Sequence, residues 1–145
     1  MQNISGFGLV INIIADTTFP VGFVVTQLAD DTDPLDTPPV RIADLALGLN
    51  GDPISWSKAI ALPMVLNVIP NSDDDRNLQI LADANRVAQN KNSANDVITA
   101  TIIYPDGTRI TMTEGKLCDA PFGLGVSTAG RMKTRSYSFL FASKT

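Results

Sequence analysis

Apolar and polar positions alternate along most of the chain, and this pattern predicts β-strands. Runs rich in β-branched and aromatic residues occupy residues 4–15 and 18–29 and meet at Asp16-Thr17, which predicts a hairpin. Both runs are apolar on both faces for much of their length, so we expect something to cover each face. The glycines inside them indicate bulges or close backbone contacts: Gly6, Gly8 and Gly22.

Two further strand regions follow. Residues 40–56 alternate on either side of Asn50-Gly51, the strongest short turn signal, and predict a second hairpin. Residues 58–69 form a long apolar strand in which Pro63 requires a sheet edge or a bulge, because proline donates no hydrogen bond.

The turn Pro105-Asp106-Gly107 joins residues 96–104 to 108–113 in the third hairpin. One face of this hairpin is apolar, and the other is rich in threonine and poor in charge. The side chains on the polar face are Thr99, Thr101, Arg109, Thr111 and Thr113. Residues 114–130 have no regular pattern, and 131–142 predict a closing strand with Tyr137, Phe139 and Phe141 on one face.

Residues 71–91 depart from alternation and predict a helix. Ser72 supplies an N-cap hydroxyl with Asp75 three positions on. The apolar residues spread over more than half of the circumference, which is wider than packing on one sheet requires. Either the helix is deeply buried in a monomer, or a second copy covers its outer side. The residues assigned to contact between copies are Ile80, Ala84, Val87 and Ala88, with the basic stripe Arg131, Lys133 and Arg135.

The segment between the first two hairpins, residues 30–39, combines four carboxylates with three prolines and predicts a projecting acidic loop. Its carboxylates are Asp30, Asp31, Asp33 and Asp36. The turn glycine and bidentate glutamate of a calcium loop are missing, so a solvated or partner-facing loop is favoured. The basic stripe of another copy is a candidate partner for this acidic loop. The alternative is that the three basic residues are ordinary scattered surface charges without a partner copy.

Composition narrows the possible functions. The 145 residues fit one domain, 1–145, and the formal net charge of −4 argues against a surface that grips nucleic acid. Histidine is absent, which removes Ser-His-Asp and Cys-His catalysis and most zinc sites. We therefore expect no enzyme activity, no metal and no cofactor.

The cysteine content and the lack of signal-like or membrane-spanning segments predict where the protein is made. The single cysteine, Cys118, excludes an internal disulfide, and the first 15 residues carry no basic residue typical of a secretory signal. The apolar runs are too short or too interrupted for a membrane helix. We expect synthesis in a host cytoplasm and no membrane anchor.

The order of hairpin, acidic loop, strands, helix, hairpin and closing strand resembles the tail-tube proteins of contractile phages and phage-like particles. That family includes tube-initiator and baseplate tube-like subunits. The resemblance spans nearly the whole chain and is carried by Ile4-Ser5-Gly6-Phe7-Gly8, Leu49-Asn50-Gly51, Val68-Ile69-Pro70-Asn71-Ser72-Asp73 with Leu78 and Leu81, and Tyr137-Ser138-Phe139-Leu140-Phe141.

The resemblance implies a mainly β fold with one helix, in which two packed antiparallel sheets are flanked by the helix. It also implies rings of six copies that stack into a tube in the virion tail, between sheath and baseplate proteins. The threonine-rich face would then line a passage through which DNA slides without binding, and residues 30–39 would be the ring-stacking loop. The alternatives are a tube-initiator or baseplate adaptor ring, a small β-barrel carrier of an apolar ligand, and an enzyme built on carboxylates.

Overall fold

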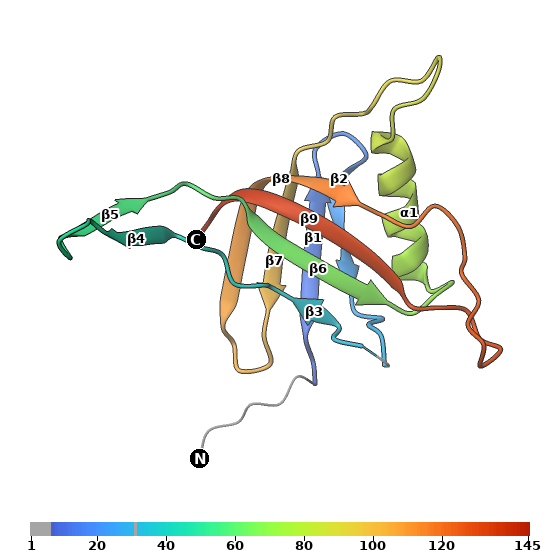
Figure 1. Cartoon of the computed structure of the whole chain (residues 1–145). Coiled ribbons are helices and arrows are strands. Elements are labelled where there is room, and N and C mark those ends of the chain that lie inside the picture. Colours follow the sequence, from blue (N-terminus) through green and yellow to red (C-terminus); the bar gives the residue numbers. More distant parts are fainter. Residues whose placement is uncertain (1–6, 31) are drawn as a thin grey trace.

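The computed structural model describes residues 7–30 and 32–145. Within these residues the chain is mainly β with a single helix, which confirms the predicted fold class (Figure 1). The elements in chain order are β1 Val10–Ala15, β2 Phe19–Val25, β3 Leu35–Asp36, β4 Ala43–Leu47, β5 Pro53–Ser57, β6 Leu62–Val68, α1 Asp73–Asn85, β7 Ile98–Ile103, β8 Arg109–Asp119 and β9 Arg135–Lys144.

Seven strands form one antiparallel sheet in the order β2-β1-β7-β8-β9-β6-β3, and β4 pairs only with β5. The large sheet curls, so that β9 and β6 cross over the strands β1 and β7 in Figure 1. The buried side chains of both halves and of α1 form one core. Its largest members are Tyr137, Phe139, Phe141, Ile11, Ile13, Met64, Leu66, Leu78, Leu81, Ile98 and Ile102. Leu78 and Leu81 fix α1 to this core.

Two glycines permit close contacts that a side chain would prevent. Gly115 lies opposite Phe141, and a Cβ there would be 2.3 Å from the phenylalanine ring. Gly22 has φ +86°, and a Cβ there would lie 2.8 Å from the Ile14 side chain, next to an irregularity in the β1–β2 register. The close approach predicted for Gly22 is therefore present, whereas Gly6 lies outside the described residues.

The structure differs from several of the predictions for single segments. The helix ends at Asn85, because Arg86 adopts an extended conformation (φ −79°, ψ 131°). Strand β8 continues to Asp119 instead of becoming irregular after residue 113, since it pairs with both β7 and β9. Residues 30–39 do not simply project, because Leu35 and Asp36 pair with β6.

The predicted hairpin at 40–56 is present as β4 and β5, and it extends from the body of the molecule at the end opposite α1 (Figure 1). The register pairs Ala43 with Ser57 and Leu47 with Pro53. Nearly all of its residues are exposed to solvent. We call this hairpin, residues 43–57, the arm.

Candidate functional site

The threonine-rich side of the sheet faces away from the core. Alternate residues of β7 are buried, and those between them are half-buried. Thr101 lies opposite Thr111 in β8 and opposite Asn12 in β1. Thr111 in turn exchanges backbone hydrogen bonds with Thr145. One row of neutral polar side chains therefore crosses the sheet from β1 to the residue that follows β9.

A second row lies beside the first. Thr113 is opposite Ser143, and their hydroxyl oxygens are 2.7 Å apart. Thr99 lies opposite Ile14 in β1. We call the two rows the hydroxyl face; its members are Asn12, Thr99, Thr101, Thr111, Thr113, Ser143 and Thr145. By alternation along β8, Arg109 points to the same side at the exposed start of the strand, so all five predicted wall residues share one face.

The hydroxyl face continues towards an open edge of the sheet. Strand β2 is the last strand on that side, and Val21 and Val24 on it are 93% and 48% exposed. The second face of the first hairpin, which the sequence led us to expect to be covered, is thus only partly covered within one copy. An open apolar edge offers unpaired backbone groups to another strand.

The acidic segment lies along β6. Asn67 donates its backbone N–H to the carbonyl of Pro34 at 3.0 Å, and its side-chain amide donates to the carbonyl of Asp33. The carboxylates Asp30, Asp33 and Asp36 are exposed, whereas Asp31 lies outside the described residues. Asp30 lies 3.4 Å from Arg131 of the same chain. We predicted that the acidic loop of one copy contacts the basic stripe of another, but the contact between Asp30 and Arg131 forms within a single chain.

The other predicted interface residues are in different environments. Ile80 is 53% exposed on the outer side of α1, and Ala84 is half-buried beneath a hydrogen bond from Ala94 to its carbonyl. Val87 and Ala88 are exposed, but they lie in the turn after the helix and not on its face. The helix therefore offers a narrower outer apolar surface than its predicted length implied.

The basic stripe is divided. Lys133 is exposed, and its backbone N–H donates to the carbonyl of Gly125. Arg135 is only 7% exposed, with its Nε 3.1 Å from Asp75 of α1. Its guanidinium also donates to Gln79 and to the carbonyl of Pro121. Arg135 therefore joins β9 to the helix inside the chain and is not exposed for contact with a second copy.

Buried carboxylates join the helix to its surroundings, a role that the sequence did not reveal. Asp74 accepts hydrogen bonds from the backbone N–H groups of Thr26 and Gln27 at 2.7 and 2.8 Å. Asp75 accepts one from the Tyr137 hydroxyl at 2.8 Å. Burial, followed by the hydrogen bond and charge of Asp75, raises the pKa of Tyr137 above its ordinary value, so this hydroxyl stays protonated as a donor.

Asp96 is fully buried at the other end of the helix. It accepts hydrogen bonds from the backbone N–H groups of Thr17 and Thr18, both at 2.9 Å, and from the Asn85 amide at 2.8 Å. Burial acts to raise the pKa of Asp96, but these hydrogen bonds and that of the Thr18 hydroxyl outweigh it, so the pKa is lowered. Asp74, Asp75 and Asp96 thus join the helix and its neighbouring segments through buried hydrogen bonds.

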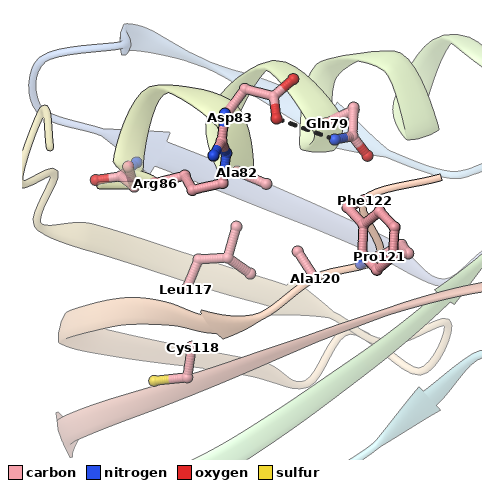
Figure 2. Close-up of a pocket in the computed structure, with 10 residues that line it drawn as sticks. Gln79, Ala82, Asp83, Arg86, Leu117, Cys118, Ala120, Pro121 and Phe122 are labelled. Atoms are coloured by element: carbon pink, nitrogen blue, oxygen red, sulfur yellow. Dashed lines mark hydrogen bonds between the residues drawn. The ribbon is translucent and has the colours of Figure 1, made fainter. Parts of the chain in front are cut away.

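A cavity of about 220 Å³ lies between α1 and residues 117–122 (Figure 2). Figure 2 shows Leu117 pointing towards the helix, with Asp83 hydrogen-bonded to Gln79 at its rim. Cys118 points to the other side of the strand and is exposed. Since the sequence has no histidine, the thiol has no imidazole to activate it.

Two negative findings apply to the described residues. No three or more Cys, Asp or Glu side chains there are arranged to hold a metal ion. No helix there has the length and apolar character needed to cross a bilayer.

Comparison with known proteins gives one family. A family model described as tail fiber protein gp32 matches residues 2–145. No curated protein matches the chain.

Proposed function

We propose that this chain, which belongs to the phage tail fiber protein gp32 family and is thus a structural protein of a virion tail, is a ring subunit of the tail tube. In this proposal copies join side by side, six to a ring, and the rings stack into a conduit for DNA. Sheath and baseplate proteins are the neighbours outside the tube, and no step requires a cofactor or catalytic turnover.

The hydroxyl face is the observation that carries the proposal. It extends over the central strands of the sheet, on the side opposite the core, and its seven members carry no charge, with Arg109 at its rim as the one basic exception among the predicted wall residues. Hydroxyl groups keep a wall hydrated without the Lys and Arg contacts whose counterion release drives DNA affinity. The net charge of −4 adds a repulsive background towards phosphates.

The open edge at β2 supports closure of copies into a ring. A neighbouring sheet added at this edge would extend the hydroxyl face from one copy to the next and cover Val21 and Val24. Closing a sheet in this way also removes edges that would otherwise promote aggregation.

The test is the state of assembly of the purified protein. We expect ring-sized masses in solution and annular particles in negative stain, and Val21→Lys together with Val24→Lys should convert these to monomers. The matched control places lysines at Thr17 and Gln89, two exposed positions in turns. A wild-type protein that remains monomeric at high micromolar concentration would contradict free ring formation.

Two other arrangements are distinguished by the same images. A tube-initiator or baseplate adaptor ring would give single rings that do not stack. The family description favours a second candidate, a subunit of a tail fiber. Fibers would appear as rods without a lumen.

A further inference from the structure

Two exposed apolar surfaces lie at opposite ends of the molecule, and neither belongs to the hydroxyl face or the β2 edge. The first is the arm. Leu45 and Leu47 are each 68% exposed, Ile54 is 55% exposed and Trp56 is 47% exposed. A two-stranded hairpin is marginally stable alone in water, so an arm of this kind is stabilised when another surface covers it.

The arm is apolar on both of its faces. The register places Leu45 opposite Ser55, and Leu47 opposite Pro53, on one face. Ile54 and Trp56 point to the other face because side chains alternate along a strand. An exposed apolar surface on both sides is unusual for a hairpin that only contacts solvent.

The base of the arm is held by charge pairs. The Asp44 carboxylate contacts the guanidinium of Arg41 and lies 2.6 Å from the Lys58 ammonium. The Lys58 backbone N–H donates to the carbonyl of Ile42 at 2.9 Å. These contacts join the two ends of the hairpin, which extends away from the body of the molecule (Figure 1).

The second surface is on the loop between β8 and β9, at the other end of the molecule in Figure 1. We call it the loop patch; its residues are Phe122, Leu124, Val126 and Met132, which are 97%, 43%, 67% and 37% exposed. The loop is ordered by hydrogen bonds from Ser127 to Arg131 and from Lys133 to Gly125, at 2.8 and 2.7 Å. A hollow of about 410 Å³ lies beside it, lined in part by Pro121, Gly125 and Lys133.

We propose that the arm of one copy docks on the loop patch of the next copy, with Trp56 as its main anchor. This inference rests on the proposed ring and adds the contact that links its subunits. The charges agree with it: Asp52 is the one charged residue in positions 45–57, whereas the exposed Lys133 flanks the patch, together with Arg131, which also contacts Asp30 of its own chain. Because the two surfaces are at opposite ends, the contact is head-to-tail, and each copy both gives an arm and receives one.

Disulfide trapping tests the contact. In a Cys118→Ser background, one chain carries Leu47→Cys in the arm and a second carries Phe122→Cys in the loop patch. Under mild oxidation we expect the mixed chains to form a covalent dimer, and the double variant L47C/F122C to form a ladder of oligomers. Mixing L47C with the control Q89C, whose cysteine lies in an exposed turn far from the patch, should give at least about tenfold less dimer.

A second measurement does not depend on cysteine chemistry. Trp56→Ser should raise the protein concentration needed for half-maximal assembly about tenfold or more, because exposed aromatic anchors contribute strongly at interfaces. Far-UV circular dichroism should remain unchanged, since the arm lies outside the core.

The outcomes separate this inference from the ring itself. Rings that form without cross-links between arm and patch, and with unchanged assembly of W56S, overturn the arm contact and leave the ring standing. Specific cross-links in a protein that forms only open chains sustain the arm contact and overturn the closed ring. An intramolecular disulfide in L47C/F122C would show that the arm returns to its own chain, which contradicts the inference.

Discussion

At the scale of single residues, buried polar groups account for features that the pattern of the chain does not reveal. Asp96 is the clearest case, because one carboxylate joins the β1–β2 turn, the end of α1 and the start of β7. A fully buried carboxylate is tolerated only when hydrogen bonds replace its hydration. The side chain therefore fixes three segments that are far apart in sequence.

Asp96→Ala should destabilise the protein by about 2–4 kcal/mol, because the two backbone donors and the Asn85 amide lose their acceptor in a buried site. The measurement is the free energy of unfolding in urea. Asp106→Ala is the control, since the exposed Asp106 accepts only a local hydrogen bond from Thr108. Equal stability of the two variants would contradict this role for Asp96.

Asp96 should also make stability depend on pH. Its pKa is lowered in the folded state from an ordinary value of 3.8, so the ionised form stabilises the native protein. The contribution is complete above the unfolded-state pKa and is lost as pH falls through the lower folded-state pKa. Urea unfolding at a series of pH values from neutral to strongly acidic should therefore show a smaller acid loss of stability for Asp96→Asn than for wild type. Parallel curves would contradict this.

Gly115→Ala should destabilise the protein by about 1–3 kcal/mol, because the new methyl group would overlap the ring of Phe141 in the core. The melting temperature and urea unfolding measure this. Gly123→Ala is the matched control, since no atom lies within 4 Å of the position its Cβ would occupy. Partial recovery of stability in G115A/F141L would locate the cause at this contact, and no recovery would argue against it.

At the scale of elements, α1 is held by buried charge as well as by apolar packing. The carboxylate of Asp75 is shared by the Tyr137 hydroxyl and the Arg135 guanidinium, both from β9. At the C-terminal end, Lys91 donates to the carbonyls of Asp83 and Arg86, and the Asp83 carbonyl also accepts the backbone N–H of the C-cap residue Arg86. Polar contacts therefore fix both ends of the helix to the rest of the chain.

Asp75→Leu should cost about 3–5 kcal/mol, since it leaves the buried guanidinium of Arg135 without its counter-ion. The double variant D75L/R135M should recover most of this loss, because two apolar groups remove the charge altogether. A double-mutant cycle in urea measures the coupling between the two positions. Additive effects would show that the ion pair contributes nothing to the attachment of α1.

At the scale of the whole molecule, one chain presents surfaces with different chemistry in different directions. The hydroxyl face carries neutral polar side chains with Arg109 at its rim, β2 is the last strand of the sheet on its side, and the arm and the loop patch are apolar at opposite ends. In a monomer the apolar surfaces would stay exposed to water, whereas in an assembly of identical subunits neighbouring copies would cover them.

T99K/T101K should leave ring assembly intact and create DNA retention, because both lysines would project from the hydroxyl face. Filter binding at several salt concentrations measures the effect, and the new affinity should fall steeply as salt rises. The control T17K/Q89K places the same charges at two exposed positions in turns. Salt-sensitive micromolar binding of DNA by the wild-type protein would contradict a wall of low affinity.

The sequence by itself determined the β-rich class, the three hairpins and the start of the helix, because these depend on local chemistry. Alternation defines strand faces, Asn50-Gly51 and Pro105-Asp106-Gly107 define turns, and the Ser72 hydroxyl accepts a hydrogen bond from the Asp75 backbone as its position predicts. The same alternation predicted that the five wall residues lie on one face of the sheet, because the face of a strand residue depends on its local position.

Only the tertiary structure decided where the remaining residues act. Val87 and Ala88 continue the helical pattern, yet α1 ends before them because Asn85 instead pairs with Asp96. Arg135 belongs to a basic stripe in the sequence, but the curl of the sheet places it against Asp75. The exposure of the arm is also a tertiary property, since alternation defines its faces but not what covers them. Contacts between residues distant in sequence set these outcomes, and local patterns carry no information about such contacts.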